Sequence, residues 1–130
     1  MSEREPEAPP AGEPSIRTVA MPADTNPNGD IFGGWLLSQM DIAGGTAAWL
    51  RAKGRTATVA IDSMTFHRPV KVGDVVSIYT RVLGTGRTSM RIFIEAWRRS
   101  RDGSMSKVTS ATFIYVAIGD DGRPRPVDPA

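Results

Sequence analysis

Residues 26–45 read Asn26-Pro-Asn-Gly-Asp-Ile-Phe-Gly-Gly-Trp-Leu-Leu-Ser-Gln-Met-Asp-Ile-Ala-Gly-Gly45. The first five residues are typical of a turn, and after the pair Gly33-Gly34 the apolar residues recur at intervals of four and three. This spacing continues to Leu50 and predicts one helix from about Gly33 to Arg51. The helix is apolar around much of its circumference, so the rest of the chain must cover more than one of its sides.

Asp41 lies on the flank of this predicted helix, in a row with Leu37, Gly44, Gly45 and Ala48. No Lys or Arg stands three or four positions away, so a local ion pair does not explain the acid. Each helical glycine costs about 1 kcal/mol relative to alanine, which suits a backbone that another group approaches closely. Two interpretations stay open from the residues alone. The carboxylate belongs to a reaction site, or the glycines allow tight packing and Asp41 points to solvent.

The composition is that of one ordinary soluble domain. With 130 residues, 40% hydrophobic and 23% charged, the chain is long enough for one core and too short for two. Residues 1–14 are rich in Glu, Pro and Ala and predict a disordered tail, which leaves residues 15–130 as the single domain. No apolar run approaches the ~20 residues that a membrane span needs. The N-terminus lacks signal-peptide features, so the expected compartment is the cytoplasm.

Several classes of site are excluded by the residue counts. The chain has no cysteine and one histidine, His67, so disulfides, thiolate chemistry and a Cys/His zinc site are ruled out and no metal is expected. The net charge is +2 and the arginines are scattered, whereas nucleic-acid binding needs a broader basic surface. Scattered arginines remain compatible with a small molecule that carries phosphates.

Alternating apolar patterns predict one strand before the helix and four after it. Their expected bounds are 15–21, 56–66, 75–83, 88–98 and 107–118. Tight turns are expected between the last four strands, with Gly84-Thr-Gly86 and Asp102-Gly103 as the clearest signals, so the sheet is predicted to be antiparallel. A sheet curled around the helix would cover it. Large apolar groups on both faces of several strands predict contact with other subunits.

Four blocks occur in a characteristic order: residues 28–41, Val59-Ala-Ile-Asp-Ser-Met-Thr-Phe66, Pro69-Val-Lys-Val-Gly-Asp74 and Gly86-Arg-Thr-Ser89. Together they resemble a hotdog-fold acyl-CoA thioesterase of the small, broad-specificity bacterial type. The resemblance runs from about Arg17 to Arg125. It implies an α+β hotdog fold, a five-stranded antiparallel sheet wrapped around one long central helix. It also implies homodimers joined at their sheet edges, commonly assembled as trimers of dimers, with active sites between protomers.

The resemblance further implies that Asp41 is the catalytic carboxylate of a thioester hydrolase that needs no cofactor. Asp41 would act as general base toward water or attack the carbonyl itself, and both routes stay open. Backbone N–H groups of Gly33 and Gly34, at the positive end of the helix, are candidates for holding the oxyanion. Related thioesterases often carry Asn at the position of Asp30. Here Asp30 is either a positioning residue or a cap of the helix, and Asn28 is a second polar candidate.

In proteins of this kind the CoA phosphates meet basic residues near strand ends. The candidates that follow are Arg68, Arg87, Thr88 and Ser89. Two other functions compete. His67 invites comparison with hotdog hydratases and dehydratases, although the glycine-rich sequence that normally follows a dehydratase histidine is absent. A non-catalytic acyl-CoA-binding module would use the same groove without releasing a thiol.

Overall fold

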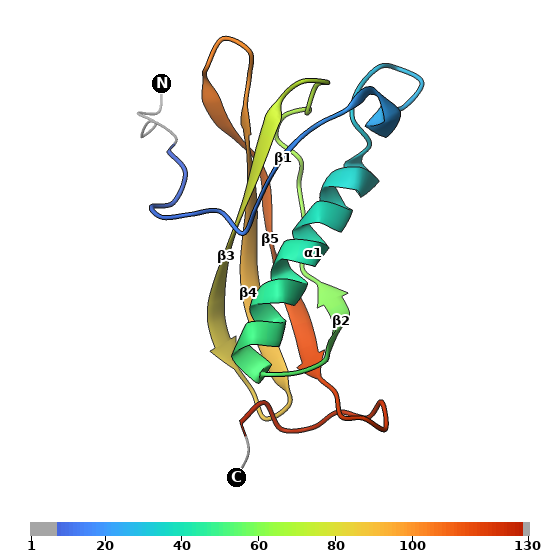
Figure 1. The fold of residues 1–130 in the computed structure, drawn as a ribbon, viewed down its shortest axis with the longest axis vertical. Helices are drawn as coiled ribbons and strands as arrows, with labels where there is room; N and C mark the ends of the chain where they lie inside the picture. The colour runs from blue at the N-terminus through green and yellow to red at the C-terminus, as the bar shows by residue number, and fades with distance from the viewer. Residues whose placement is uncertain (1–7, 129–130) are drawn as a thin grey trace.

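A computed structural model describes residues 8–128, in which one long helix lies across a five-stranded sheet (Figure 1). The helix is α1 (Gly33–Ala52), and a short 3₁₀ turn, η1 (Pro22–Asp24), precedes it. The strands are β1 (Ile16–Val19), β2 (Thr56–Ile61), β3 (Val75–Thr85), β4 (Ser89–Arg99) and β5 (Met105–Ala117). Their order in the sheet is β1-β3-β4-β5-β2, and every neighbouring pair is antiparallel. The predicted α+β class and the antiparallel sheet are confirmed.

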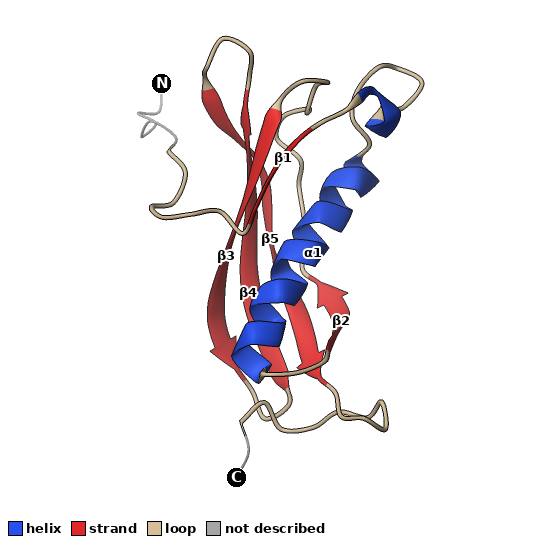
Figure 2. Ribbon diagram, in the orientation of Figure 1, coloured by secondary structure: helices blue, strands red, loops and turns tan. Residues whose placement is uncertain are grey.

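The core lies between α1 and the inner face of the sheet, which curls along the helix (Figure 2). Leu36, Met40 and Ala43 of α1 are buried, as their helical spacing predicts. The sheet side chains buried in the same cluster include Ile78, Ile92, Ile94 and Phe113. Full burial of one such large apolar side chain contributes roughly 2 kcal/mol. This packing fixes the position of α1, and with it the position of Asp41.

The prediction for the second strand is wrong in two respects. β2 ends at Ile61 rather than at residue 66, and no tight turn joins it to β3, because β2 pairs with β5 at the far edge of the sheet. A β-bulge between Thr58 and Ala60 bends the strand before its ladder ends. Residues 62–74 then cross toward β3. The first part of this crossing still follows β5, since the His67 N–H donates to the Val108 carbonyl at 2.8 Å.

Both edges of the sheet, β1 and β2, lack a further strand within residues 8–128. On β2, Val59 is 57% exposed and Ile61 is 41% exposed. An open, apolar edge strand favours pairing with another chain. The tail predicted at residues 1–14 lies partly outside the described residues, because nothing is described before residue 8. In the part that is described, Pro10 and Ala11 line a hollow on the sheet face together with residues of β3 and β4.

No helix in the described part of the chain is long and apolar enough to cross a membrane.

Candidate active site

Asp41 lies in the middle of α1, on its side toward β2 and β5, and is half-buried. Its Oδ1 accepts two hydrogen bonds, from the Thr58 hydroxyl at 2.7 Å and from the Tyr115 hydroxyl at 2.9 Å. Among residues 8–128, no hydrogen bond or ion pair is made to Oδ2. The interpretation in which Asp41 simply points to solvent is therefore wrong, since two other elements of the fold hold the carboxylate.

Gly44 explains how Tyr115 reaches this carboxylate. A Cβ atom on Gly44 would lie within 3.0 Å of both the Tyr115 hydroxyl oxygen and the Ile94 Cδ1 atom, closer than real Cβ contacts. The missing side chain forms a notch in α1 that admits the tyrosine. Gly45 differs, because a Cβ atom there would make an ordinary contact of 3.9 Å with the Tyr115 ring. The glycine pair thus has one member that packing requires and one that it does not.

Tyr115 remains protonated under ordinary conditions and is therefore a hydrogen-bond donor. Its side chain is 1% exposed. Burial, together with the hydrogen bond to Asp41 and its negative charge, raises the pKa of Tyr115 well above its usual range. Neither Tyr115 nor Thr58 is identifiable as a site residue from the sequence alone. Tyr115 falls within the strand predicted at residues 107–118, but no local spacing connects it to residue 41, 74 positions earlier.

An apolar groove begins at Asp41 and continues along the solvent side of α1. Its volume is about 300 Å³, and its lining consists of Asp41, Ile42, Gly45, Thr46, Trp49 and Leu50. Three of these side chains are unusually exposed for their size: Ile42 at 57%, Trp49 at 54% and Leu50 at 71%. A row of large apolar side chains ending at a carboxylate suits a ligand or a protein surface that is itself apolar.

The start of α1 carries no side-chain cap. Phe32 occupies the N-cap position without a side-chain hydrogen bond. Of the two alternatives for Asp30, the helix cap is excluded: its carboxylate pairs with the Lys71 ammonium across the neighbouring loop. Asn28 lies in an exposed loop, where its N–H donates to the Asn26 side chain.

Gly33 and Gly34 form the first turn of α1, as predicted. Gly33 precedes Asp41 by eight residues, or about 12 Å along the helix axis. Within one protomer, Asp41 and the N–H groups of this turn therefore cannot contact the same thioester carbonyl, because each contact requires a distance of about 3 Å.

The four predicted CoA contacts do not come together within one chain. Arg68 donates to the Lys107 carbonyl at the start of β5. At the other end of β5, the Ala117 N–H donates to the Thr88 carbonyl. Ten residues of strand separate these two points, which is about 33 Å. The β3–β4 turn contains Arg87 and Thr88, and Ser89 is the first residue of β4. Arg68 lies near the opposite end of the sheet.

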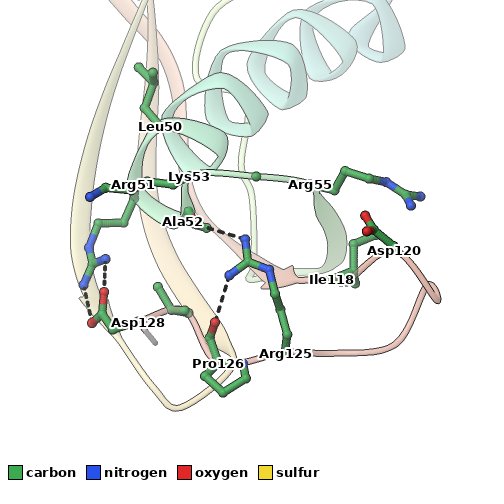
Figure 3. Close-up of a pocket in the computed structure, with 13 residues that line it drawn as sticks. Leu50, Arg51, Ala52, Lys53, Arg55, Ile118, Asp120, Arg125, Pro126 and Asp128 are labelled. Carbon is green, nitrogen blue, oxygen red and sulfur yellow. Dashed lines mark hydrogen bonds and ion pairs between the residues drawn. The ribbon is translucent and has the colours of Figure 1, made fainter. Parts of the chain in front are cut away.

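A larger hollow, of about 830 Å³, lies beside that β3–β4 turn, at the C-terminal end of α1 (Figure 3). The Val127 N–H donates to the Arg87 carbonyl at 2.9 Å. Val127 also lines the hollow, so the C-terminal segment contacts both the β3–β4 turn and the hollow. Two cations of the lining have partners: Arg51 pairs with Asp128, whose pKa it lowers, and Arg125 donates to the Ala52 carbonyl. The lining also contains Lys53 and Arg55, both exposed.

No group of three or more His, Asp or Glu side chains within residues 8–128 is placed to hold a metal ion.

Comparisons with known proteins agree with one another. A family model described as the thioesterase superfamily matches residues 28–104. The acyl-CoA thioester hydrolase YciA of Salmonella typhimurium is 55% identical over 122 residues, which cover 91% of this chain and 92% of YciA. The crystal structure of the hexameric thioesterase y2039 from Yersinia pestis has a TM-score of 0.87 and 53% identity, and the match covers 93% of this chain and 99% of that one.

A second solved structure is that of HI0827, a hexameric broad specificity acyl-coenzyme A thioesterase. It is 44% identical, with a TM-score of 0.87, and the match covers 94% of this chain and 85% of that one.

Proposed function

Because the chain belongs to the thioesterase superfamily, we propose that it hydrolyses the thioester bond of acyl-CoA and releases CoA and a carboxylic acid. The observation that carries this proposal is the Asp41 carboxylate, held by two hydroxyl donors at the end of an apolar groove. Thioester hydrolysis needs a group that delivers water to the carbonyl, or attacks it, and donors for the oxyanion that forms. A carboxylate and water suffice for this chemistry, so we propose no cofactor, and the cytoplasm as its compartment.

The protein acts as a homodimer in this proposal. The 12 Å separation along α1 means that Asp41 and the first turn of the helix can serve one thioester only when they come from two protomers. The open edge of β2 and the exposed row along α1 are the surfaces that a second copy would cover. Joining two β2 edges would make one continuous sheet. The hexameric relatives support a trimer of such dimers.

In the proposed complex, the acyl chain enters the groove between protomers and the thioester lies at Asp41. The N–H groups of Gly33 and Gly34 of the partner subunit face the carbonyl oxygen, where the positive end of the helix stabilises the developing negative charge. Asp30, paired with Lys71, fixes the loop that leads into this turn. We assign Asn28 and Asp30 no direct part in the chemistry.

The nucleotide end of CoA is proposed to bind at the hollow between the end of α1 and the β3–β4 turn. From Asp41 to Ala52 the helix rises about 16 Å. The extended pantetheine arm spans such a distance, so a thioester at Asp41 places the phosphates near Arg87, Thr88 and Ser89. Arg68 lies too far away in the same protomer and would meet this CoA only from another subunit.

Arg87→Gln is expected to raise KM for acyl-CoA up to about fivefold and to leave kcat unchanged, because one solvent-exposed charge contact contributes at most about 1 kcal/mol. The difference should shrink at high salt, which screens exposed charges. Steady-state kinetics at two ionic strengths checks this. Arg91→Gln on the outer face of the adjoining strand is the matched control, and equal KM values for the two variants would contradict the assignment of Arg87.

The proposed function is tested by thiol release from a panel of acyl-CoAs, from short to long chains, with thermal stability measured on the same samples. We expect release from several esters, and the panel gives the chain-length preference. A rise in melting temperature with acyl-CoA but no thiol release would identify a binding module instead, since binding alone stabilises the folded state.

A further inference from the structure

We infer that Thr58 and Tyr115 are positioning residues that aim the catalytic carboxylate: both hydroxyls bind Oδ1 of Asp41, so that Oδ2 is the oxygen that acts on water or on the thioester. This inference rests on the proposed hydrolase function and assigns a role to two side chains outside the helix. It also makes the two oxygens of one carboxylate unequal.

The two donors form a cross-strand pair. Thr58 of β2 lies opposite Tyr115 of β5 in the antiparallel ladder, and side chains of opposite residues project from the same face of a sheet. Their hydroxyls converge on one atom at 2.7 and 2.9 Å, both good hydrogen-bond lengths. Both donors belong to one rigid β-ladder and bind the same oxygen atom. They therefore fix the orientation of the Asp41 carboxylate plane.

Tyr115 is the less movable of the two donors. Its ring is buried in the notch at Gly44 and stacks with Phe113 at 6.3 Å between ring centroids. The same hydroxyl lies 3.2 Å from the Asp41 backbone carbonyl oxygen and shares its one proton between that oxygen and Oδ1. Thr58, by contrast, is exposed on the edge strand that we propose as the dimer contact. Formation of the dimer would therefore order the second donor.

Two effects of losing a donor oppose each other. A carboxylate with one hydrogen bond fewer is a stronger base, which favours proton abstraction. It also gains freedom to rotate about its Cβ–Cγ bond, and a displacement of about 1 Å at a reacting group costs up to about 10²-fold in rate. Losing one neutral donor raises the rate through basicity by less than this factor. We therefore expect the loss of carboxylate orientation to dominate and the rate to fall.

The test compares Thr58→Val, which removes the hydroxyl at nearly constant volume, with Thr58→Ser, which keeps it. We expect Thr58→Val to lower kcat about tenfold, equivalent to one hydrogen bond to a charged group, with KM nearly unchanged. Thr58→Ser should recover most of the rate. Tyr115→Phe should lower kcat by a similar factor, and the double variant Thr58→Val/Tyr115→Phe by more than either single change.

Thr56→Val is the matched control, because Thr56 lies on the same strand, two positions away and opposite Ala117. It should keep the wild-type kcat. Melting temperatures of all variants show whether each one folds, and Tyr115→Phe, which removes the other donor to Oδ1, keeps the test decisive if the valine variant is unstable.

Wild-type kcat in folded Thr58→Val and Tyr115→Phe, with an active wild-type enzyme, would overturn the positioning roles alone. The same holds for a serine variant as slow as the valine variant. A wild-type protein that releases no thiol from any acyl-CoA would overturn the proposed function as well, so the two failures are distinguishable.

Discussion

Asp41→Asn is expected to lower kcat for acyl-CoA hydrolysis on the order of 10² or more while the protein keeps its fold. The amide is the same size as the carboxylate, and its oxygen can still accept from Thr58 and Tyr115. It cannot accept a proton from water or attack a carbonyl, so chemistry is lost without loss of packing. Thiol-release kinetics and a melting temperature on the same preparation measure both properties.

The matched control is Asp102→Asn. Asp102 lies in the β4–β5 turn, where its carboxylate accepts hydrogen bonds from Ser104, and an amide oxygen can do the same. This variant should keep the wild-type rate. A folded Asp41→Asn protein with an unchanged kcat would remove the carboxylate from the mechanism.

Gly44→Ala and Gly45→Ala should have opposite effects on stability although the residues are neighbours. At Gly44, a methyl group would overlap the Tyr115 hydroxyl and Ile94, both almost fully buried. Overpacking of a core costs up to about 3 kcal/mol, and the gain of about 1 kcal/mol in helix propensity offsets part of it. We expect a net loss of about 2 kcal/mol, which for this chain length lowers the melting temperature by roughly 8 °C.

At Gly45 the added methyl group meets only an ordinary contact, so the helix-propensity gain of up to about 1 kcal/mol remains. The Gly45→Ala protein should melt up to roughly 4 °C higher than wild type. Chemical denaturation of both variants gives the free energies directly. Equal stabilities would show that the notch at Gly44 is not required. The Gly44→Ala variant should also lose activity, because the displaced tyrosine no longer aims Asp41.

Much of the fold is predictable from local pattern. The helical spacing after Gly33 located α1 to within one residue at each end, and alternation identified all five strands. What local pattern cannot supply is which strands pair. The bounds of β2 and its place beside β5 depend on contacts between residues more than 50 positions apart. A bulge, which breaks the alternation, hides the true end of this strand.

The same limit applies to the candidate site. Asp41 was identifiable from the sequence because it is an acid on the flank of an apolar helix with no oppositely charged residue three or four positions away. Its donors were not, since Thr58 and Tyr115 reach it only after the sheet forms. For Asp30 the sequence left a positioning role and a helix cap open, and it did not reveal the ion pair with Lys71, 41 residues later in the sequence. Likewise, Arg68 and Arg87 look equivalent as basic residues near strand ends, yet they lie at opposite ends of β5.

In the proposed dimer, Asp41 of one protomer and the first turn of α1 in its partner act on one thioester. A purified heterodimer of an Asp41→Asn chain and a Gly33→Pro chain tests it most directly. Proline is tolerated at the first helical position after the extended Phe32, and it removes the Gly33 N–H. Either homodimer should be slower than wild type on the order of 10².

If the site is shared, one of the two sites in the heterodimer carries both changes and the other carries none, so about half of the wild-type activity should return. If each site lies within one protomer, both sites stay damaged. A heterodimer as inactive as its two parents would therefore contradict the account.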